Sequence, residues 1–487
     1  MRSLRLVLLA AAVCAAATGT EAALAAVRTP SLARVTVTPA IYPDYSPAIH
    51  DYVVRCDPSD PVRISAWPGV GTTPLIDGKA RRTASLKLAT DEAVTIADRA
   101  GRLTQAYHIR CLPSDFPDWT VTGVGATDDW TIATPSLSLG MATSHYVAIF
   151  DPNGVPVWWY RTSRVPIDAT LLPGPTIAFA SFPAASQNYE IHRLDGTLAG
   201  LIVSPDGHID DHELQRTANG DYVYLVYDPK QHVDLTPFGG PADGTVLEGK
   251  IEEVTPKGKL VWSWSTDGHV DLSESTRWLS TIIGTPVVLT DGESTYDFFH
   301  ANAVSLDKDV VLLSLRQTDG IYAIDKATGQ ILWKLGGTPT PESLNVVGDP
   351  DGAAPLGGQH DVRVLPDGTI TVFDDGTFLG RAPRAVRYRI DTAAHTATMV
   401  QQITDPAVGT SLCCGSARML ANGDWVVSWG GDDVVGEYDP DGTQLFQLAF
   451  DGLFSYRAVP VEESLLSATE LRAGMNAMAA KAEAAAH

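Results

Sequence analysis

The sequence of 487 residues has little positive charge, few cysteines and no long apolar run beyond its first residues. Lysine and arginine number 35 against 58 aspartate and glutamate, which gives a net charge of -23. Proteins that bind nucleic acid or anionic membranes need a cationic excess, and this chain lacks one. No later run approaches the roughly 20 apolar residues that span a bilayer. We therefore expect no nucleic-acid partner and no membrane insertion.

Residues 1–26 carry two arginines, then a short apolar run, then small residues around an Ala-Leu-Ala sequence. This order is typical of a signal peptide. We therefore expect an exported protein, either secreted or periplasmic. One of the five cysteines falls in this segment, so four would remain in the mature chain.

The four remaining cysteines form two pairs. Cys56 and Cys111 close two near-duplicate phrases, Tyr-Val-Val-Arg-Cys and Tyr-His-Ile-Arg-Cys. In an oxidising compartment this similarity predicts a disulfide between them. Cys413 and Cys414 are adjacent, and the sequence leaves open whether they form a vicinal disulfide or remain thiols.

Two segments differ from the middle of the chain. Residues 30–115 consist of short β-type runs separated by proline, glycine and aspartate, which predicts a small β-sandwich. This segment resembles the cadherin-like domains of bacterial exported proteins. Residues 461–487 are rich in alanine, glutamate and leucine, and we expect a helical tail there.

Residues 120–460 contain a repeat, which indicates a fold more strongly than local propensity does. The unit is a strand, a turn and a second strand. Its six copies span 146–160, 189–202, 250–264, 321–335, 386–400 and 435–449. Six such hairpins predict a six-bladed β-propeller, in which the sheets pack face to face around a channel. The whole chain is therefore expected to be all-β.

A second repeat lies between these hairpins, and three of its four copies begin with histidine. The copies start at His212, His300, His360 and Gly415, each eight residues before a turn. The strand that enters a propeller blade lines the central channel, so we expect the three imidazoles to converge there. Imidazoles are costly to desolvate without partners, which indicates a ligand, a metal or a reaction.

Two kinds of ligand suit three converging imidazoles. One is a metal, because imidazole binds zinc and copper. Glu213 and Asp361, however, each directly follow a histidine and would point to the opposite face of a straight strand. The other is an oxyanion, because Arg316, expected at the end of the strand that starts with His300, offers a fork of donors for sulfate or phosphate. An arginine would also repel a divalent metal, so the residues favour an oxyanion and no metal.

Several motifs, in this order along the chain, resemble those of the bacterial arylsulfotransferases. They are Phe298-Phe-His-Ala-Asn302, Leu313-Ser-Leu-Arg316, residues 324–337, Gly358-Gln-His-Asp361, Phe373-Asp-Asp-Gly376, residues 413–418, residues 425–431 and Ser455-Tyr-Arg457. The resemblance covers roughly residues 120–460. It implies a six-bladed propeller that moves a sulfuryl group from an aryl sulfate to a phenol, without a nucleotide donor or other cofactor.

The resemblance also implies roles for individual side chains. His360 would be the nucleophile that becomes sulfated. Around the sulfate the resemblance places His300, Asn302, Arg316 and His212. A histidine of this set would exchange a proton with the phenol, and the sequence leaves open which one.

The chain departs from the family at Asp374-Asp-Gly376, where Asp-Asn-Gly is common. The Pro- and Gly-rich stretches 231–245 and 337–358 are expected at the channel mouth, where they would shape the choice of acceptor.

Two other functions stay open. One is a non-catalytic propeller that binds a partner or a glycan. The other is a quinoprotein-type dehydrogenase. Residues 323–333 resemble the tryptophan-docking repeat of those enzymes, in a single copy.

Overall fold

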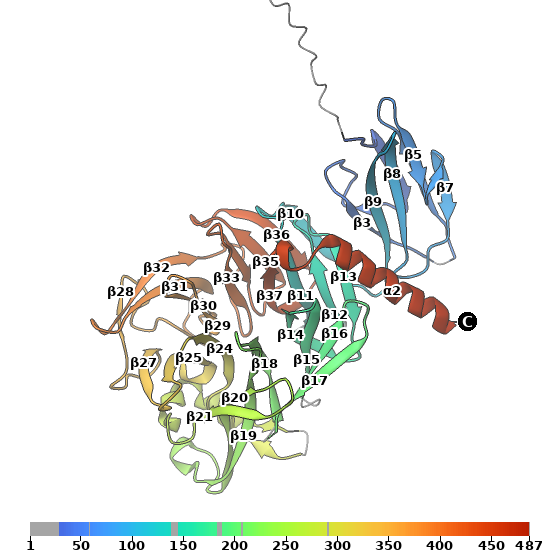
Figure 1. Cartoon of the computed structure of the whole chain (residues 1–487). Helices are drawn as coiled ribbons and strands as arrows, with labels where there is room; N and C mark the ends of the chain where they lie inside the picture. Colours follow the sequence, from blue (N-terminus) through green and yellow to red (C-terminus); the bar gives the residue numbers. More distant parts are fainter. Residues whose placement is uncertain are drawn as a thin grey trace, which may run out of the picture.

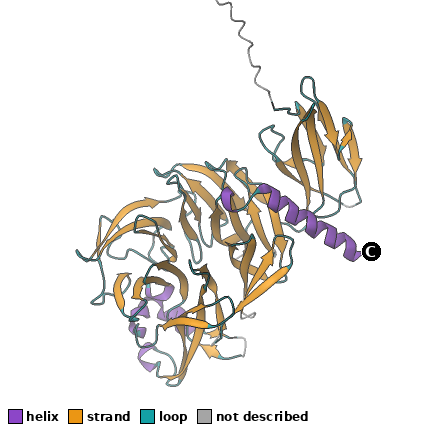
Figure 2. Cartoon of the chain, in the orientation of Figure 1, coloured by secondary structure: helices purple, strands orange, loops and turns teal. Residues whose placement is uncertain are grey.

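The computed structural model describes residues 29–57, 59–137, 145–182, 188–205, 208–289 and 292–486. The expected signal peptide lies outside these residues. Strands dominate the described chain, which confirms the all-β class (Figure 2). No helix within these ranges is long and apolar enough to cross a membrane.

Residues 34–112 form two sheets that share one apolar core. The first has the order β1 (Arg34–Thr38), β4 (Val62–Trp67) and β7 (Thr83–Leu86). The second has the order β2 (Ile41–Tyr42), β3 (Asp51–Arg55), β9 (Leu103–Leu112), β8 (Ala93–Ala100), β5 (Thr73–Ile76) and β6 (Lys79–Ala80). Alternation along β4 buries Val62, Ile64 and Ala66. A disulfide joins Cys56 to Cys111, the pair expected from the sequence.

Six further sheets of four or five strands follow in the described part of the chain. Three are β13 (Pro156–Arg161), β12 (Tyr146–Phe150), β11 (Trp130–Leu137) and β37 (Phe454–Val461); β14 (Val165–Leu172), β15 (Thr176–Phe182), β16 (Asn188–Arg193) and β17 (Leu198–Val203); and β18 (His208–Arg216), β19 (Tyr222–Val233), β20 (Gly244–Val254) and β21 (Leu260–Ser265).

The other three sheets complete the series. They are β24 (Ala301–Asp307), β25 (Val310–Leu315), β26 (Gly320–Asp325) and β27 (Ile331–Gly336); β29 (His360–Val364), β30 (Thr369–Asp374), β31 (Arg384–Asp391), β32 (Thr396–Ile403) and β28 (Asn345–Val347); and β33 (Ser416–Met419), β34 (Trp425–Ser428), β35 (Val434–Tyr438), β36 (Gln444–Phe450) and β10 (Trp119–Gly123).

All six hairpins expected from the first repeat are present. The turn after β12 shows why this sequence forms a hairpin. Asp151 Oδ1 accepts hydrogen bonds from the backbone N–H groups of Asn153, at 2.9 Å, and Val155, at 2.8 Å. Gly154 supplies the positive φ, 71°, that the turn requires.

The six sheets meet through one strand each. These strands are β37, β14, β18, β24, β29 and β33; each contacts the next, and β33 contacts β37, so the series closes on itself (Figure 1). We call them the inner strands. Both ends of the region take part in the closure, because β37 pairs with β11 and β10 pairs with β36.

Helix α2 (Ala468–Ala486) lies between the first two sheets and the six-sheet region (Figure 1). A reciprocal pair of hydrogen bonds between Ser467 and Glu470 caps its start. Arg472 forms an ion pair with Asp51 on β3 at 2.5 Å, while Met475 is fully buried in the core beneath β13. The helix therefore ties the two parts of the chain together.

The connection from β21 to β24 contains its own short elements. They are the 3₁₀ helix η2 (Leu272–Trp278), helix α1 (Leu279–Gly284) and the strand pair β22 (Val287–Val288) and β23 (Ser294–Thr295). Three other 3₁₀ turns are η1 (Thr236–Phe238), η3 (Arg316–Thr318) and η4 (Glu463–Leu465). We call residues 272–295 the helical connection.

A belt of buried and partly buried ion pairs joins the inner strands. Its members are Asp168 on β14, Glu213 on β18, Asp361 and Arg363 on β29, Arg418 on β33 and Arg457 on β37. Strand β24 joins through backbone carbonyls, because Asn302 accepts from Arg457 at 2.7 Å and Val304 accepts from Arg363 at 2.9 Å. Every inner strand is therefore connected to this belt.

Arg457 is the centre of the belt. Its guanidinium lies 2.5 Å from Asp168, 3.3 Å from Glu213 and 3.3 Å from Asp361, and its side chain is 1% exposed. Burial alone would lower the pKa of Arg457, but the surrounding carboxylates outweigh it and raise that pKa. Removing this one side chain would leave three carboxylates without their shared counter-charge.

We expect an Arg457→Met variant to lose about 3–5 kcal/mol of unfolding free energy, because buried Asp168 would lose its arginine partner and Glu213 and Asp361 would each lose one of theirs. Guanidinium denaturation followed by tryptophan fluorescence measures the loss. Arg216→Met is the matched control, because Arg216 is exposed and donates only to a backbone carbonyl in its own turn, and it should change stability by less than about 0.5 kcal/mol. Equal stability of the two variants would contradict the role of the belt.

Candidate active site

Five inner strands break their pairing register at the belt. The breaks fall between Ile167 and Thr170 on β14, Asp210 and Leu214 on β18, Ala301 and Ala303 on β24, His360 and Arg363 on β29, and Ser455 and Ala458 on β37. A bulge re-aims the side chains within it. The strands that carry Glu213 and Asp361 are therefore not straight, although His212 and Glu213 still line different cavities.

The three histidines of the second repeat lie close together, two of them beside one tyrosine. The ring centroids of His212 and His300 are 4.9 Å apart. Tyr456, on β37, lies 5.6 Å from the ring of His212 and 6.5 Å from that of His360. The convergence that the repeat predicted is present in the structure, while Gly415 lies directly before β33.

Each of two imidazoles is held by a carboxylate a few residues before it. His300 Nδ1 lies 2.6 Å from Asp297 Oδ2, and His212 Nδ1 contacts Asp210 Oδ1 directly. Asp211 is also near, with Oδ1 3.4 Å from His212 Nδ1. Asp210, Asp211 and His212 bring three potential metal ligands within 4.8 Å of one another. Because Asp210 already engages the imidazole Nδ1, we interpret this group as an ion pair.

The contacts of His360 determine its tautomer. Its Nε2 lies 3.2 Å from the backbone nitrogen of Cys414, which can only donate, so Nε2 is the unprotonated nitrogen. Nδ1 therefore carries the proton and donates to Asp375 Oδ2 at 2.8 Å. Ser411 Oγ donates to the other oxygen of Asp375 at 2.6 Å, which fixes the carboxylate. Cys413 and Cys414 are both free thiols in the structure.

The surroundings push two of the imidazoles toward opposite charge states. Burial and the nearby charge of Arg316 hold the pKa of His360 well below its usual value. Burial also opposes the charge of His212, but Asp210 and Asp211 outweigh it and raise the pKa of His212 to about 9. Near pH 7 the site therefore combines a neutral imidazole with an imidazolium.

Arg316 lies beside the histidines but not where the sequence placed it. It follows β25 as the first residue of η3, whereas the sequence put it at the end of the strand that starts with His300. Its backbone nitrogen donates to the carbonyl of His300 at 3.0 Å, which explains the proximity. Nη2 donates to the carbonyl of Leu412 at 2.7 Å, and the guanidinium lies 4.3 Å above the ring of Trp278.

Asn302 lies on β24 with its amide directed at the neighbouring inner strand. Nδ2 donates to the carbonyl of Gln359 at 2.7 Å, and Gln359 directly precedes His360. Oδ1 is buried and has no hydrogen-bond partner among the described residues. The amide therefore holds the backbone that carries His360.

Four residues of the site were not assigned a role from the sequence. They are Asp210, Asp297, Asp375 and Tyr456. Two of these carboxylates had a local signal, because an aspartate stands two or three residues before His212 and His300. Asp375 and Tyr456 belong to motifs that carry the family resemblance, but nothing in their spacing shows that they contact a histidine.

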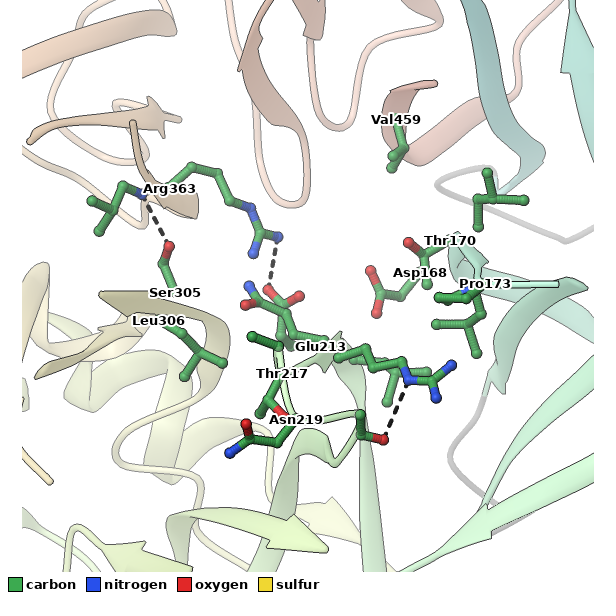
Figure 3. Close-up of a pocket in the computed structure, with 18 of the residues that line it drawn as sticks. Asp168, Thr170, Pro173, Glu213, Thr217, Asn219, Ser305, Leu306, Arg363 and Val459 are labelled. Atoms are coloured by element: carbon green, nitrogen blue, oxygen red, sulfur yellow. Dashed lines mark hydrogen bonds and ion pairs between the residues drawn. The ribbon is translucent and has the colours of Figure 1, made fainter. Parts of the chain in front are cut away.

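A cavity of about 520 Å³ opens beside His212 and His300. The helical connection contributes Thr281, Ile282, Thr285, Val287, Val288 and Leu289 to its wall. The stretches 231–245 and 337–358, which were expected at the mouth, contribute none of the described lining residues. The belt lines a separate cavity of about 790 Å³, in which Glu213 faces Arg363 (Figure 3).

The raised pKa of His212 predicts a pH dependence of stability. The folded chain holds this proton up to about pH 9, whereas an unfolded histidine releases it near pH 6.5. The stabilisation is complete below pH 6.5 and is lost as the pH rises to about 9, by roughly 3 kcal/mol in total. Midpoints of urea unfolding, recorded at several pH values across this range, measure the loss of stabilisation. His212→Gln should flatten the slope, while the exposed His232→Gln should retain it; equal slopes would contradict the assignment.

The comparisons with solved structures give low similarity. A protein of unknown function from Bacteroides caccae has a TM-score of 0.43 and 14% identity over 69% of this chain and 99% of its own. Virginiamycin B lyase from Staphylococcus aureus has a TM-score of 0.36 and 11% identity over 68% and 87%. A gluconolactonase from Xanthomonas campestris has a TM-score of 0.34 and 12% identity over 69% and 90%.

Among curated proteins, none matches the chain. A family model does match, that of the arylsulfotransferases (ASST), over residues 185–451. The match covers more than half of the chain and includes four of the six inner strands, with all three converging histidines. The chain therefore belongs to the arylsulfotransferase family.

Proposed function

We propose that this protein transfers a sulfuryl group from an aryl sulfate to a phenolic acceptor in two steps, through a sulfated His360. The observation that carries the proposal is the pair of contacts that sets the tautomer of His360, in which the unprotonated Nε2 accepts from the backbone N–H of Cys414 at 3.2 Å. Family membership supports the reaction class. We further propose that the six sheets are the blades of a propeller and that residues 1–26 direct export.

In the first step, Nε2 of His360 attacks the sulfur, the N–S bond forms, and the S–O bond to the aryl group breaks. Asp375 keeps the proton on Nδ1, so the attacking lone pair stays on Nε2. The low pKa of His360 keeps the imidazole neutral, and therefore nucleophilic, near pH 7. As the N–S bond forms, Nε2 releases the backbone N–H of Cys414, whose hydrogen bond of 3.2 Å is at the long end of the normal range.

Two cationic groups are suited to the charge on the sulfuryl oxygens. Arg316 is 9% exposed, and its Nε has no partner among the described residues. A buried guanidinium donor in this state would gain a hydrogen bond from an oxyanion. The imidazolium of His212 supplies a second fixed positive charge, and prearranged charges of this kind are often the largest catalytic contribution.

The leaving aryl oxide needs a proton, and the acceptor phenol must lose one. We propose that His212 or His300, both beside the 520 Å³ cavity, gives the proton to the aryl oxide. In the second step the acceptor oxygen attacks the sulfur, the N–S bond breaks, and the phenolic proton returns to the same imidazole. The protein is then restored, and the sulfuryl group has moved between two phenols.

We expect His360→Ala to lower 4-nitrophenol release from 4-nitrophenyl sulfate by about a thousandfold or more, because no intermediate can form. The matched control is His232→Ala, an exposed histidine that should retain activity. Incubation with donor alone, followed by intact-mass and peptide analysis, should place one sulfuryl group on His360. Wild-type turnover by the alanine variant, or an adduct on another residue, would contradict the proposal.

A further inference from the structure

The cavity beside His212 and His300 has two kinds of wall. One wall is aliphatic and consists of Ile282, Val287, Val288 and Leu289 from the helical connection. The other wall is polar and carries the two imidazoles together with the carboxylates of Asp211 and Asp297. A volume of about 520 Å³ fits a substituted aromatic ring, and the aliphatic wall suits its faces.

The polar wall combines carboxylates with imidazoles. Asp211 and Asp297 line it together with His208, His212 and His300, while Asp210 contacts His212 without lining the cavity. No lysine or arginine is among the described residues that line the cavity.

Asp211 is the carboxylate with unused bonding capacity. Its residue is 2% exposed, it lines the cavity, and its Oδ2 has no hydrogen-bond partner in the described part of the chain. Burial raises the pKa of Asp211 to about 7 despite the nearby imidazolium of His212. A buried carboxylate oxygen without a donor is costly, and a cationic donor on a ligand would relieve that cost.

We propose that this cavity binds the aromatic ring of the substrates and selects rings with an ammonium substituent over rings with a carboxylate, with Asp211 as the selecting residue. The inference rests on the proposed sulfuryl transfer and adds the charge class of its phenols. An ammonium group can donate to the unsatisfied oxygen of Asp211, whereas a carboxylate placed beside that oxygen meets a second negative charge.

Three para-substituted phenols of similar size test the selection: tyramine, the neutral 4-ethylphenol and 4-hydroxyphenylacetate. With 4-nitrophenyl sulfate as donor, we expect kcat/KM for tyramine to exceed that for 4-hydroxyphenylacetate by about tenfold, with 4-ethylphenol between them. High salt should reduce the ratio, because it screens charge. A ratio near one in the wild-type protein would overturn the proposal.

The variant Asp211→Asn should bring the ratio close to one, while the control Asp243→Asn, at an exposed aspartate, should retain it. The ratio is the readout rather than the absolute rate, because Asp211 lies 3.4 Å from His212 and its loss also affects the site. An unchanged ratio in Asp211→Asn would overturn the role of this residue.

Binding without donor separates this inference from the proposed function. If no phenol is sulfated, the transfer reaction fails, but calorimetric titration of the wild-type protein with tyramine and 4-hydroxyphenylacetate still tests the cavity. Tighter binding of tyramine would support the selection by charge. Equal binding, or binding of neither phenol, would overturn it.

Discussion

The arrangement of the six-sheet region depends on the buried contacts of Arg457. This side chain sits on the last strand and reaches carboxylates on β14, β18 and β29, the first of which lies 289 residues earlier in the chain. Packing of aliphatic side chains would stabilise six sheets equally well, and buried ion pairs alone are weak evidence of stability. Ion pairs with fixed geometry, however, also set how far each inner strand extends toward the centre.

That geometry matters because the residues of the belt are sequence neighbours of the residues of the site. Glu213 follows His212, Asp361 follows His360, and Arg457 follows Tyr456. On a regular strand such neighbours face opposite sides, and the register breaks in β18 and β29 change the direction of the side chains at these positions. His300 and Asp361 adopt positive φ values of 48° and 57°, a conformation that non-glycine residues seldom take. The ion pairs offset the cost of these conformations, and the bulges aim the imidazoles.

This coupling explains what the sequence predicts and what it does not. The six hairpins follow from local chemistry such as the Asp151 turn, and the convergence of the histidines follows from their equal distance to a turn. The carboxylate partners depend on the bulges, and a bulge leaves no period in the sequence. The position of Arg316 could not be predicted from the sequence either, because its place beside His300 comes from a backbone contact between two strand ends. The order of motifs identifies the family, but the chemistry of the cavity wall depends on the helical connection, which carries no repeat.

The net charge of -23 poses a physical problem for an enzyme whose proposed donor is an anion. At physiological ionic strength the Debye length is about 8 Å, so the distant surface charge is largely screened and the local groups decide. Locally, the charge of Arg316 lies near His360, while the cavity wall combines the imidazolium of His212 with Asp211 and Asp297. The sulfuryl end of a ligand can meet Arg316 and His212, and a positive group on its ring can meet Asp211. The acidic character of the chain is therefore compatible with binding a sulfate ester, provided that the rest of the ligand does not add negative charge.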